Sequence, residues 1–483
     1  MPTTRNKAIL MTFLSPIEMG RYRSIETLWF TIGFLCLGLI GMGADALAED
    51  GGTPVRAELW THLSSDAKAI NVRGMSAHFD DSGDRRVLRL EVPELNVALG
   101  EIHSSGRGIA WVGLPPPAEG WDLGSAECVQ ARVQNAGATP AEVTLWVVGS
   151  NGWTAVGDSS VLKPSESTTL RCLLRETFPD GTPKIDPIRI KEIRVMVQRA
   201  DTAAMVVSDM IATGTVEPWV RPTGRIDVPD MVEGSPAPGR RVRYRLSDDP
   251  DAEIYGTLYL PPDWNPNKRY PVIAEFPGNI FFHAKACWST GRPEQCQMGY
   301  GITLGTDAIW VSLPFVDRET GQIAEAGFGS REGDDTAAYT VRVIDDICAN
   351  WGGDRDNLIL CGFSRGAIAC GYIGLRNDTI AGLWKGFVAC QHYDGSNWRQ
   401  SRMEDAIERA PRFRGRAIFQ VDNSGSADNT GGTANYEQLM AHTDPAVKWT
   451  WVSSGLGSHA TAMFLDDRPS TQQLRQWFDG LQR

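Results

Sequence analysis

The sequence lacks two features that would each indicate a class of protein. It has no excess of basic residues, because 47 Lys and Arg stand against 59 Asp and Glu, for a net charge of −12. Sequence-independent binding of nucleic acid needs a basic surface, so we expect no nucleic-acid partner. It also has no CxxC pair and no Cys/His cluster with zinc spacing. We therefore expect no metal site and no cofactor.

An uncharged apolar run occupies residues 28–43, with Arg21 and Arg23 before it and the small residues Ala46 and Ala48 after it. A short run that ends in a processing site is typical of a secretory signal peptide and not of a spanning helix. We predict a signal peptide at 1–48, cleaved near Ala48, with an uncleaved anchor as the alternative. The mature protein is then secreted or periplasmic and has no membrane partner.

Cysteine is present nine times, and Cys36 would leave with the signal peptide. The remaining eight form an even number, and an oxidising compartment permits disulfides. Cys287 and Cys296 are close together in a loop-like stretch that contains Gly and Pro, so we predict that they pair. Several others lie in apolar segments, where a cysteine can simply be a small buried residue.

The chain of 483 residues is long enough for two domains. Residues 55–214 contain successive short strand-like runs, several with alternating apolar and polar residues, separated by turn residues. Strands at this spacing without helical periodicity predict an all-β antiparallel sandwich. Residues 215–241 are rich in Pro and Gly and predict a linker.

From residue 242 to 483 strand-like runs alternate with helical segments, which predicts a doubly wound α/β domain. Ligands of such sheets bind at the carboxyl ends of the strands. In the helix expected at 334–351, five apolar residues fall on one face: Ala338, Val341, Ile344, Ile347 and Cys348.

A short motif, Gly362-Phe363-Ser364-Arg365-Gly366, lies between a predicted strand at 357–363 and a predicted helix at 366–377. It matches G-x-S-x-G, in which the serine sits on a sharp strand-to-helix turn above the sheet. Glycines at 362 and 366 allow the turn and a close approach of helix to strand. Residues 240–483 thus resemble the α/β-hydrolases, and the resemblance implies that Ser364 is a nucleophile.

A serine hydroxyl needs a base, which follows it in the order of this superfamily. The histidines after Ser364 are His392, His442 and His459. We predict His459, because its glycine-rich loop lies between the last strand-like run and the last helix, where the superfamily keeps its base.

The acid would hold the imidazole tautomer and stabilise the imidazolium. Asp428 lies in a loop after the strand at 416–422, the usual position in the superfamily, and is our prediction. Asp422, which ends that strand, and Asp394, which follows the strand before it, stay as alternatives.

An oxyanion hole needs two fixed donors. The resemblance implies the backbone N–H of Arg365 and an N–H from Asn279 or Ile280, although Pro277-Gly278-Asn279 replaces the family's usual His-Gly. The Arg365 side chain would bind the oxyanion or a substrate carboxylate. Glucuronoyl esterases similarly have arginine after the serine, but their following Asn-Gly-Lys is absent here. A salt bridge on the helix flank is the other interpretation.

The loop after Asn279 is aromatic and should overhang the pocket. We predict substrate contacts for Phe281 and Trp288 on this side and for His392 and Tyr393 on the other rim. In the alternative, the aromatic residues of this loop form a small satellite core.

The N-terminal strands resemble the jelly-roll, galactose-binding-like modules of secreted carbohydrate-active enzymes, which implies either sugar binding or a packing role. Together these features predict a secreted serine hydrolase of carboxylic esters, acting on acyl or uronoyl esters of polysaccharide. The alternatives are a peptidase resembling prolyl oligopeptidase, a polyester depolymerase, and a carbohydrate-binding protein without activity. No blade-like repeat accompanies the hydrolase segment, which disfavours the peptidase.

Overall fold

A computed structural model describes residues 56–64, 70–83, 85–93, 109–150, 154–198, 202–249, 251, 253–283, 287–423 and 437–482. All of these residues belong to one compact unit. The predicted signal peptide, Cys36 and Asp428 lie outside the described residues. Among the described helices, none combines the length and the apolar composition that crossing a membrane requires.

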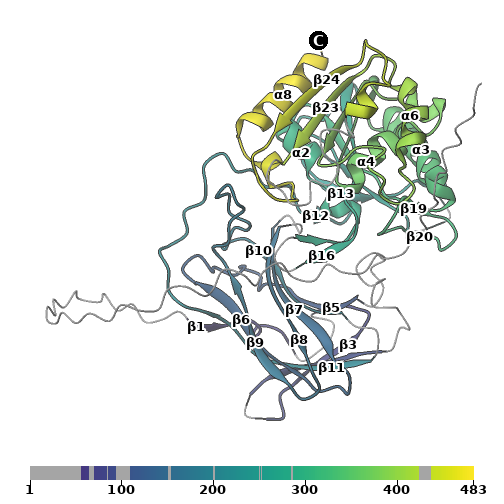
Figure 1. Cartoon of the computed structure of the whole chain (residues 1–483). Coiled ribbons are helices and arrows are strands. Elements are labelled where there is room, and N and C mark those ends of the chain that lie inside the picture. The colour runs from purple at the N-terminus through teal and green to yellow at the C-terminus, as the bar shows by residue number, and fades with distance from the viewer. Residues whose placement is uncertain are drawn as a thin grey trace, which may run out of the picture. The chain divides into compact units, whose positions relative to one another are not determined.

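Two antiparallel sheets contain the strands of the N-terminal half (Figure 1). The first has the order β3-β4-β11-β6-β9, with β1 also paired to β11. Its strands are β1 (Arg56–Glu58), β3 (Ser76–Asp80), β4 (Val87–Val92), β6 (Cys128–Asn135), β9 (Ser167–Leu173) and β11 (Ala203–Thr213). The second has the order β2-β5-β10-β7-β8. Its strands are β2 (Asn71–Arg73), β5 (Ile109–Leu114), β7 (Ala141–Gly149), β8 (Ala155–Leu162) and β10 (Ile190–Gln198).

Strand β7 shows that the second sheet is buried on both faces. Val143, Leu145 and Val147 belong to the core that both sheets share. Trp146 and Val148 alternate with them and therefore point to the other face. There they join a separate apolar cluster that contains Trp288 of the C-terminal half. The outer face of this sheet is thus a surface on which the C-terminal half of the chain packs.

The C-terminal half is built on a nine-stranded sheet of order β12-β13-β14-β18-β15-β21-β22-β23-β24. From β18 to β24 all neighbours run parallel, whereas β14 is antiparallel to both β13 and β18. The strands are β12 (Met231–Val232), β13 (Arg241–Tyr244), β14 (Gly256–Tyr259), β15 (Tyr270–Phe276), β18 (Ile309–Ser312), β21 (Gly353–Phe363), β22 (Gly386–Cys390), β23 (Ala417–Asp422) and β24 (Lys448–Ser453). Two hairpins stand beside it: β16 (Phe281–His283) with β17 (Cys287–Ser289), and β19 (Val316–Asp317) with β20 (Gln322–Ile323).

Helices cover both faces of this sheet, as the alternating side chains of β21 show. Leu358 and Leu360 enter one apolar core, which includes residues of α3, α4, α5 and α6. Ile359 and Cys361 enter another, with residues of α2 and α8. The helices are α2 (Met298–Thr303), α3 (Asp334–Asn350), α4 (Arg365–Tyr372), α5 (Asp378–Ala381), α6 (Met403–Arg409) and α8 (Pro469–Leu481), with short 3-10 turns η2 (Pro293–Gln295), η3 (Arg331–Gly333), η4 (Ala410–Phe413) and η5 (Ala462–Leu465). A largely parallel sheet covered on both faces, with a serine between β21 and α4, is an α/β-hydrolase-like fold.

The buried face of α3 includes the predicted Ile344 and Ile347 but is wider than predicted. Ala338 is exposed and Val341 only half-buried, whereas Ala337, Thr340 and Val343 are buried. A buried hydrogen bond contributes to this choice, because the hydroxyl of Thr336 donates to the carbonyl of Phe328 at 2.7 Å. A buried threonine with a partner is tolerated in a core, so apolar periodicity alone missed the polar part of the buried face.

The predicted disulfide between Cys287 and Cys296 is wrong. All seven cysteines whose side chains the structure describes are free thiols, and Cys296 is one of them. Its Sγ lies beneath the sheet, 3.9 Å from the backbone oxygen of Glu275, and burial raises its pKa. The chain at Cys287 is instead paired with His283 in the β16–β17 hairpin.

Candidate active site

Ser364 stands on the turn between β21 and α4 in a strained backbone conformation. Its φ is 56° and its ψ is −119°, a region that residues with a side chain rarely adopt. Such strain costs about 1–3 kcal/mol and persists only where the surrounding structure enforces it. The N–H of Ser364 donates to the carbonyl of Cys390 on the neighbouring strand, at 3.0 Å, which helps to hold the turn.

The two glycines of the motif allow this turn to pack. A Cβ at Gly362 would lie 2.3 Å from the backbone of Gly366. A Cβ at Gly366 would lie 2.1 Å from the carbonyl oxygen of Phe276, at the end of β15. Both distances are too short for any side chain, so glycine brings the start of α4 directly against the loop that follows β15.

Ser364 and His459, 95 residues apart, meet at this turn. The Oγ of Ser364 lies 3.0 Å from the Nε2 of His459. The His459 ring also packs against the ring of Phe363, with 4.6 Å between centroids. The 3.0 Å between Oγ and Nε2 is the hydrogen-bond distance that a nucleophile and its general base require.

The other ring nitrogen of His459 has an amide partner. Nδ1 lies 3.3 Å from the side-chain carbonyl oxygen Oε1 of Gln391, the residue after β22. An amide oxygen only accepts, so Nδ1 carries the proton and Nε2 is left to accept from Ser364. Burial, together with the nearby imidazole of His392, lowers the pKa of His459 to about 3. The histidine is therefore neutral at ordinary pH.

Both ring nitrogens of His459 are thus engaged, and neither bonds to a described aspartate. Asp394 instead forms a buried ion pair with Arg409, at 2.8 and 2.9 Å, and accepts from Ser401 at 3.0 Å. Asp422 ends β23, where its backbone carbonyl accepts from the N–H of Ser454 at 2.7 Å. The geometry therefore does not place Asp394 or Asp422 as the acid, and Asp428 lies outside the described residues.

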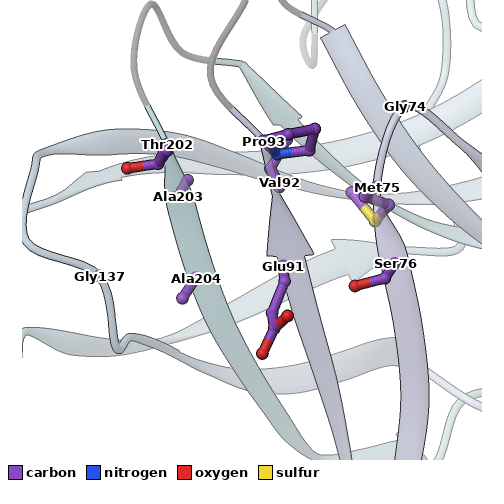
Figure 2. Close-up of a pocket in the computed structure, with 10 residues that line it drawn as sticks. All are labelled: Gly74, Met75, Ser76, Glu91, Val92, Pro93, Gly137, Thr202, Ala203 and Ala204. Atoms are coloured by element: carbon purple, nitrogen blue, oxygen red, sulfur yellow. The ribbon is translucent and has the colours of Figure 1, made fainter.

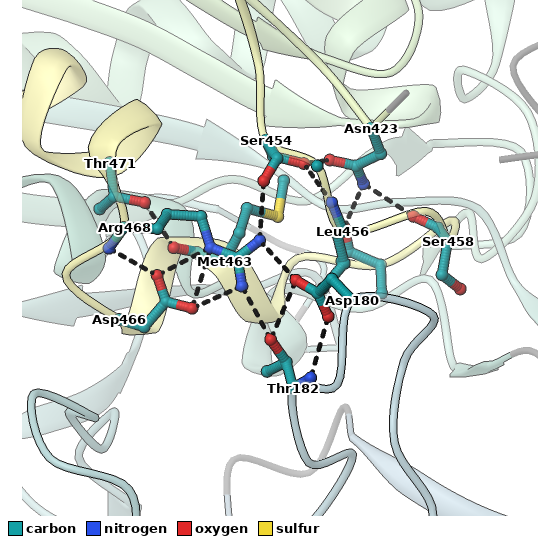
Figure 3. A network of polar contacts seen from close by, with 12 residues as sticks. Asp180, Thr182, Asn423, Ser454, Leu456, Ser458, Met463, Asp466, Arg468 and Thr471 are labelled. Atoms are coloured by element: carbon teal, nitrogen blue, oxygen red, sulfur yellow. Dashed lines mark hydrogen bonds and ion pairs between the residues drawn. The ribbon is translucent and has the colours of Figure 1, made fainter. Parts of the chain in front are cut away.

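Asn423, fully buried directly after β23, holds the loop that carries His459. Its Nδ2 donates to the carbonyls of Ser458 and Ala460, at 2.8 and 2.9 Å. These are the residues on either side of His459. The Oδ1 of Asn423 accepts from the hydroxyl of Ser454, at the start of the same loop (Figure 3). One amide group thereby fixes the loop at three points.

A second contact ties this loop to the N-terminal half of the chain. Arg468 donates to the carbonyl of Ser454 at 2.9 Å, to the hydroxyl of Thr182 at 3.0 Å, and pairs with Asp180 at 3.0 Å (Figure 3). Gly457 adds a steric contact, since a Cβ there would lie 3.0 Å from Pro179. The turn around residues 178–182 therefore buttresses the histidine loop.

The side chain of Arg365 is buried, at 1% exposure, and binds neither solvent nor a carboxylate. Its guanidinium donates to the carbonyls of Gly278, Gly291, Ala324 and Gly327, at 2.8–3.0 Å. It also lies 4.0 Å from the centroid of the Phe315 ring, and burial lowers its pKa. The side chain thus joins three loops around the site, and the predicted alternative of a surface salt bridge is wrong.

The backbone N–H groups of Asn279 and Ile280, predicted as oxyanion donors after β15, differ in whether they already have an acceptor. The N–H of Ile280 donates to the carbonyl of Glu325 at 2.9 Å, so it is already used and is no oxyanion donor. The Asn279 side chain is tied to the carbonyl of Ile280 and the N–H of Gly327. The backbone N–H of Asn279 therefore remains as the candidate on this loop. The N–H of Arg365 is the first of α4 and has no acceptor within its own helix.

The predicted substrate-contacting aromatic residues have different surroundings. Phe281 is 40% exposed, on β16. Trp288 is buried, with its ring 5.7 Å from that of Trp111 and 5.4 Å from that of Trp146. Its packing corresponds to the satellite-core alternative. Tyr393 is buried in the main core, whereas His392 is half-buried with its ring 5.4 Å from that of His459.

Two other features of the described residues bear on function. Nowhere among them do three or more His, Cys, Asp or Glu side chains come together to hold a metal.

A cavity of about 680 Å³ lies beside β3, β4 and β11, lined among others by Ser76, Glu91 and Thr202 (Figure 2). None of its ten described lining residues is aromatic, so it offers no flat ring for stacking a sugar.

Sequence reasoning missed Gln391 and Asn423. A signal for both was present, because each directly follows a predicted parallel strand, and side chains at the carboxyl ends of such strands face the site. The sequence prediction considered only carboxylates as partners of the histidine. It therefore missed Gln391, which contacts the ring of His459, and Asn423, which holds its loop.

Comparisons with known proteins give no family for the chain: no family model matches, and no curated protein matches. Among solved structures, a fungal esterase from Rhizomucor miehei is 11% identical, over 47% of this chain and 79% of that one, with a TM-score of 0.35. A ferulic acid esterase is 14% identical, over 50% of this chain and 97% of that one, with a TM-score of 0.34. A putative dipeptidyl aminopeptidase IV from Bacteroides ovatus is 14% identical over 50% of this chain, with a TM-score of 0.36.

The chain spans 35% of that aminopeptidase and 25% of an exo-beta-agarase that it also matches. At these identities and TM-scores the likeness does not establish an activity.

Proposed function

We propose that this protein is a serine hydrolase that cleaves carboxylic esters. The observation that supports the proposal is the 3.0 Å contact between the Oγ of Ser364 and the Nε2 of His459 at a strained strand-to-helix turn. A neutral imidazole with its proton on Nδ1 is ready to accept the serine proton. Strain maintained at such a turn is consistent with a functional position.

In this mechanism Ser364 attacks the ester carbonyl while His459 takes its proton. The N–H groups of Arg365 and Asn279 stabilise the resulting oxyanion. His459 then protonates the leaving alcohol, which leaves an acyl-enzyme on Ser364. Water, deprotonated by His459, attacks the acyl group and releases the carboxylic acid, so Ser364 regains its proton. Neither metal nor organic cofactor enters any step.

The acid of this mechanism remains Asp428 in our proposal. Gln391 holds Nδ1 in the described structure, and Asp428 would have to replace it to act as a carboxylate partner. Separate Asp428→Ala and Gln391→Ala variants distinguish the two. If Asp428 is the acid, only its removal should lower kcat by several orders of magnitude.

The biological setting is part of the proposal. We place a signal peptide at 1–48, a sandwich domain at 55–214, a linker at 215–241 and the catalytic domain at 242–483. A jelly-roll-like companion and export favour acyl or uronoyl esters on polysaccharide, and this substrate class rests on analogy.

The test is hydrolysis of 4-nitrophenyl acetate by the purified chain and by its Ser364→Ala variant, together with labelling by a fluorophosphonate. We expect activity and labelling that are both lost in the variant, with kcat reduced by about 10³-fold or more. Activity that survives the substitution would exclude Ser364 as the nucleophile. Turnover of peptide anilides in preference to esters would assign a peptidase.

A further inference from the structure

A second cavity, of about 610 Å³, is lined by the outer face of the second N-terminal sheet and by the catalytic half of the chain. We refer to it as the cationic cleft. Strands β2, β5, β7 and β10 contribute one wall, and β13, the end of β17 and η2 contribute the other. Its volume is in the range of natural ligand sites. We propose that this cleft binds a carboxylate-bearing oligosaccharide and is a substrate subsite of the proposed esterase.

The charge of the lining points to an anion. Five cationic side chains line the cleft, against two carboxylates: Arg73, Lys191, Arg194, Arg243 and Arg292, against Glu192 and Glu294. Adding the ion-pair partners Glu325 and Asp230 still leaves five cations for four carboxylates. This local excess occurs in a chain whose net charge is −12.

Two of the cations are more exposed than the two carboxylates that line the cleft, Glu192 and Glu294, which are 5% and 28% exposed. The side chains of Lys191 and Arg243 are 46% and 40% exposed. Lys191 and Arg243 are therefore accessible to a ligand that enters the cleft, beside the exposed Asp230 that pairs with Lys191.

Lys191 and Arg243 have donors to offer such a ligand. Lys191 lies 3.7 Å from Asp230 and Arg243 lies 3.9 Å from Glu294, and neither distance is a hydrogen bond. The Arg243 guanidinium rests on the ring of Tyr255, 4.3 Å from its centroid, which directs its fork without using its N–H groups. A guanidinium that is held by an aromatic ring and keeps its N–H groups available can bind a carboxylate with two hydrogen bonds.

The rest of the lining suits a ligand that also carries hydroxyl groups. Asn71, Tyr255, Thr290 and Gln295 provide neutral hydrogen-bonding side chains, and Glu294 accepts from hydroxyl donors. These groups already bond within the lining, Asn71 to Glu192, Tyr255 to Glu294 and Thr290 to Gln295, so sugar hydroxyls would exchange with these contacts. Sugar acids combine hydroxyl donors with carboxylates on one scaffold, whereas an acidic peptide offers few hydroxyls. The chemistry therefore favours an oligouronate.

One residue, Gln295, connects the cationic cleft with the neighbourhood of Ser364. Gln295 lines the cationic cleft and also a cavity of about 10 Å³ beside the proposed catalytic site. Phe363, which precedes Ser364, and Gly278 of the oxyanion loop line that smaller cavity. A polysaccharide with uronate units in the cleft would have to extend past Gln295 and Gly278 for its ester to reach Ser364. This inference rests on the proposed function, because the cleft is called a subsite only if Ser364 reacts.

Binding is measured on the full-length Ser364→Ala chain by calorimetry, so that it does not depend on catalysis. The probes are tetragalacturonate, its fully methyl-esterified neutral form, and tetraglutamate. We expect tetragalacturonate to bind about tenfold or more tightly than the neutral form at low salt, and to weaken as salt screens the exposed cations. Equal binding of the two sugars overturns the proposal, and tighter binding of tetraglutamate assigns a peptide site instead.

Variants locate the binding in the cleft. The Lys191→Gln and Arg243→Gln variants should each bind tetragalacturonate about two- to fivefold more weakly. The double variant should bind it about tenfold more weakly. Arg132→Gln, an exposed arginine of the other N-terminal sheet, is the matched control and should change nothing. Unchanged affinity in the double variant, with its fold intact by thermal unfolding, overturns the assignment. Hydrolysis of neutral 4-nitrophenyl acetate tests the proposed function separately, so the two failures can be told apart.

Discussion

The side-chain oxygen of Gln391 lies 3.3 Å from Nδ1 of His459, at the ring position where a serine hydrolase normally presents a carboxylate. An amide fixes the tautomer as a carboxylate does, but it does not stabilise the imidazolium that forms during reaction. This agrees with the lowered pKa of His459, about 3.

The first prediction concerns pH and Gln391→Glu. Protonation of His459 stops it from accepting the serine proton, so kcat/KM falls as pH drops through the pKa of His459. With Gln391 at Nδ1, burial and His392 keep that pKa low, so the acid limb of the wild type should lie well below pH 6.5; a limb near or above pH 6.5 would indicate that Asp428 takes this position. A carboxylate at 391 favours the imidazolium and should move the limb up by about 1–3 pH units. The control is Gln391→Met, which should lower kcat without that shift, and an unmoved limb in the Glu variant contradicts the contact.

The second prediction concerns Asn423 and the histidine loop. Asn423→Ala leaves the carbonyls of Ser458 and Ala460 without their donor, at a cost of about 1–3 kcal/mol for each buried group. We expect a lower unfolding free energy and a fall in kcat that exceeds any change in KM, because His459 is no longer held. Asn423→Asp keeps the shape and the acceptor for Ser454 but lacks the donor. It should therefore also lower kcat more than it changes KM. An Asp variant with wild-type kcat would mean that these bonds do not position His459.

The third prediction concerns the pair formed by Arg468 and Asp180. Their contact joins the N-terminal half to the loop of His459, so its loss should affect catalysis as well as stability. A double-mutant cycle with Asp180→Asn and Arg468→Gln should give a coupling of about 0.5–3 kcal/mol in unfolding, and a non-additive effect on kcat. Asp209→Asn, which breaks an ion pair with the exposed Arg85, is the matched control. Additive effects on both quantities would show that the two halves are not coupled here.

The fourth prediction concerns Arg365, whose guanidinium satisfies four buried carbonyls. Arg365→Met keeps the apolar stem and removes every donor. We expect the unfolding free energy to fall by about 3 kcal/mol or more, measured by denaturant titration. Arg132→Met, at an exposed position, should stay within about 0.5 kcal/mol of the wild type. A stable Met variant would show that solvent can replace the guanidinium.

Some of the fold could be predicted because it is encoded locally. Strand β21 ends at Phe363, as the strand predicted at 357–363 does, and α3 begins at the expected residue. The burial of Thr336 in α3 could not be predicted in this way, because its hydroxyl finds an acceptor in Phe328, a residue outside the helix.

The candidate site divides in the same manner. By itself the sequence determined the turn at Ser364 and singled out His459, because a glycine-flanked serine between strand and helix is a local pattern and chain order limits the base to a few histidines. Only the tertiary structure decided that Gln391 contacts the imidazole and that Cys296 stays a thiol. It also decided that the Arg365 side chain donates to backbone carbonyls of the loops around the site. Each of these depends on which backbone and side-chain groups come within hydrogen-bond distance after residues tens of positions apart have packed, and local composition does not contain that information.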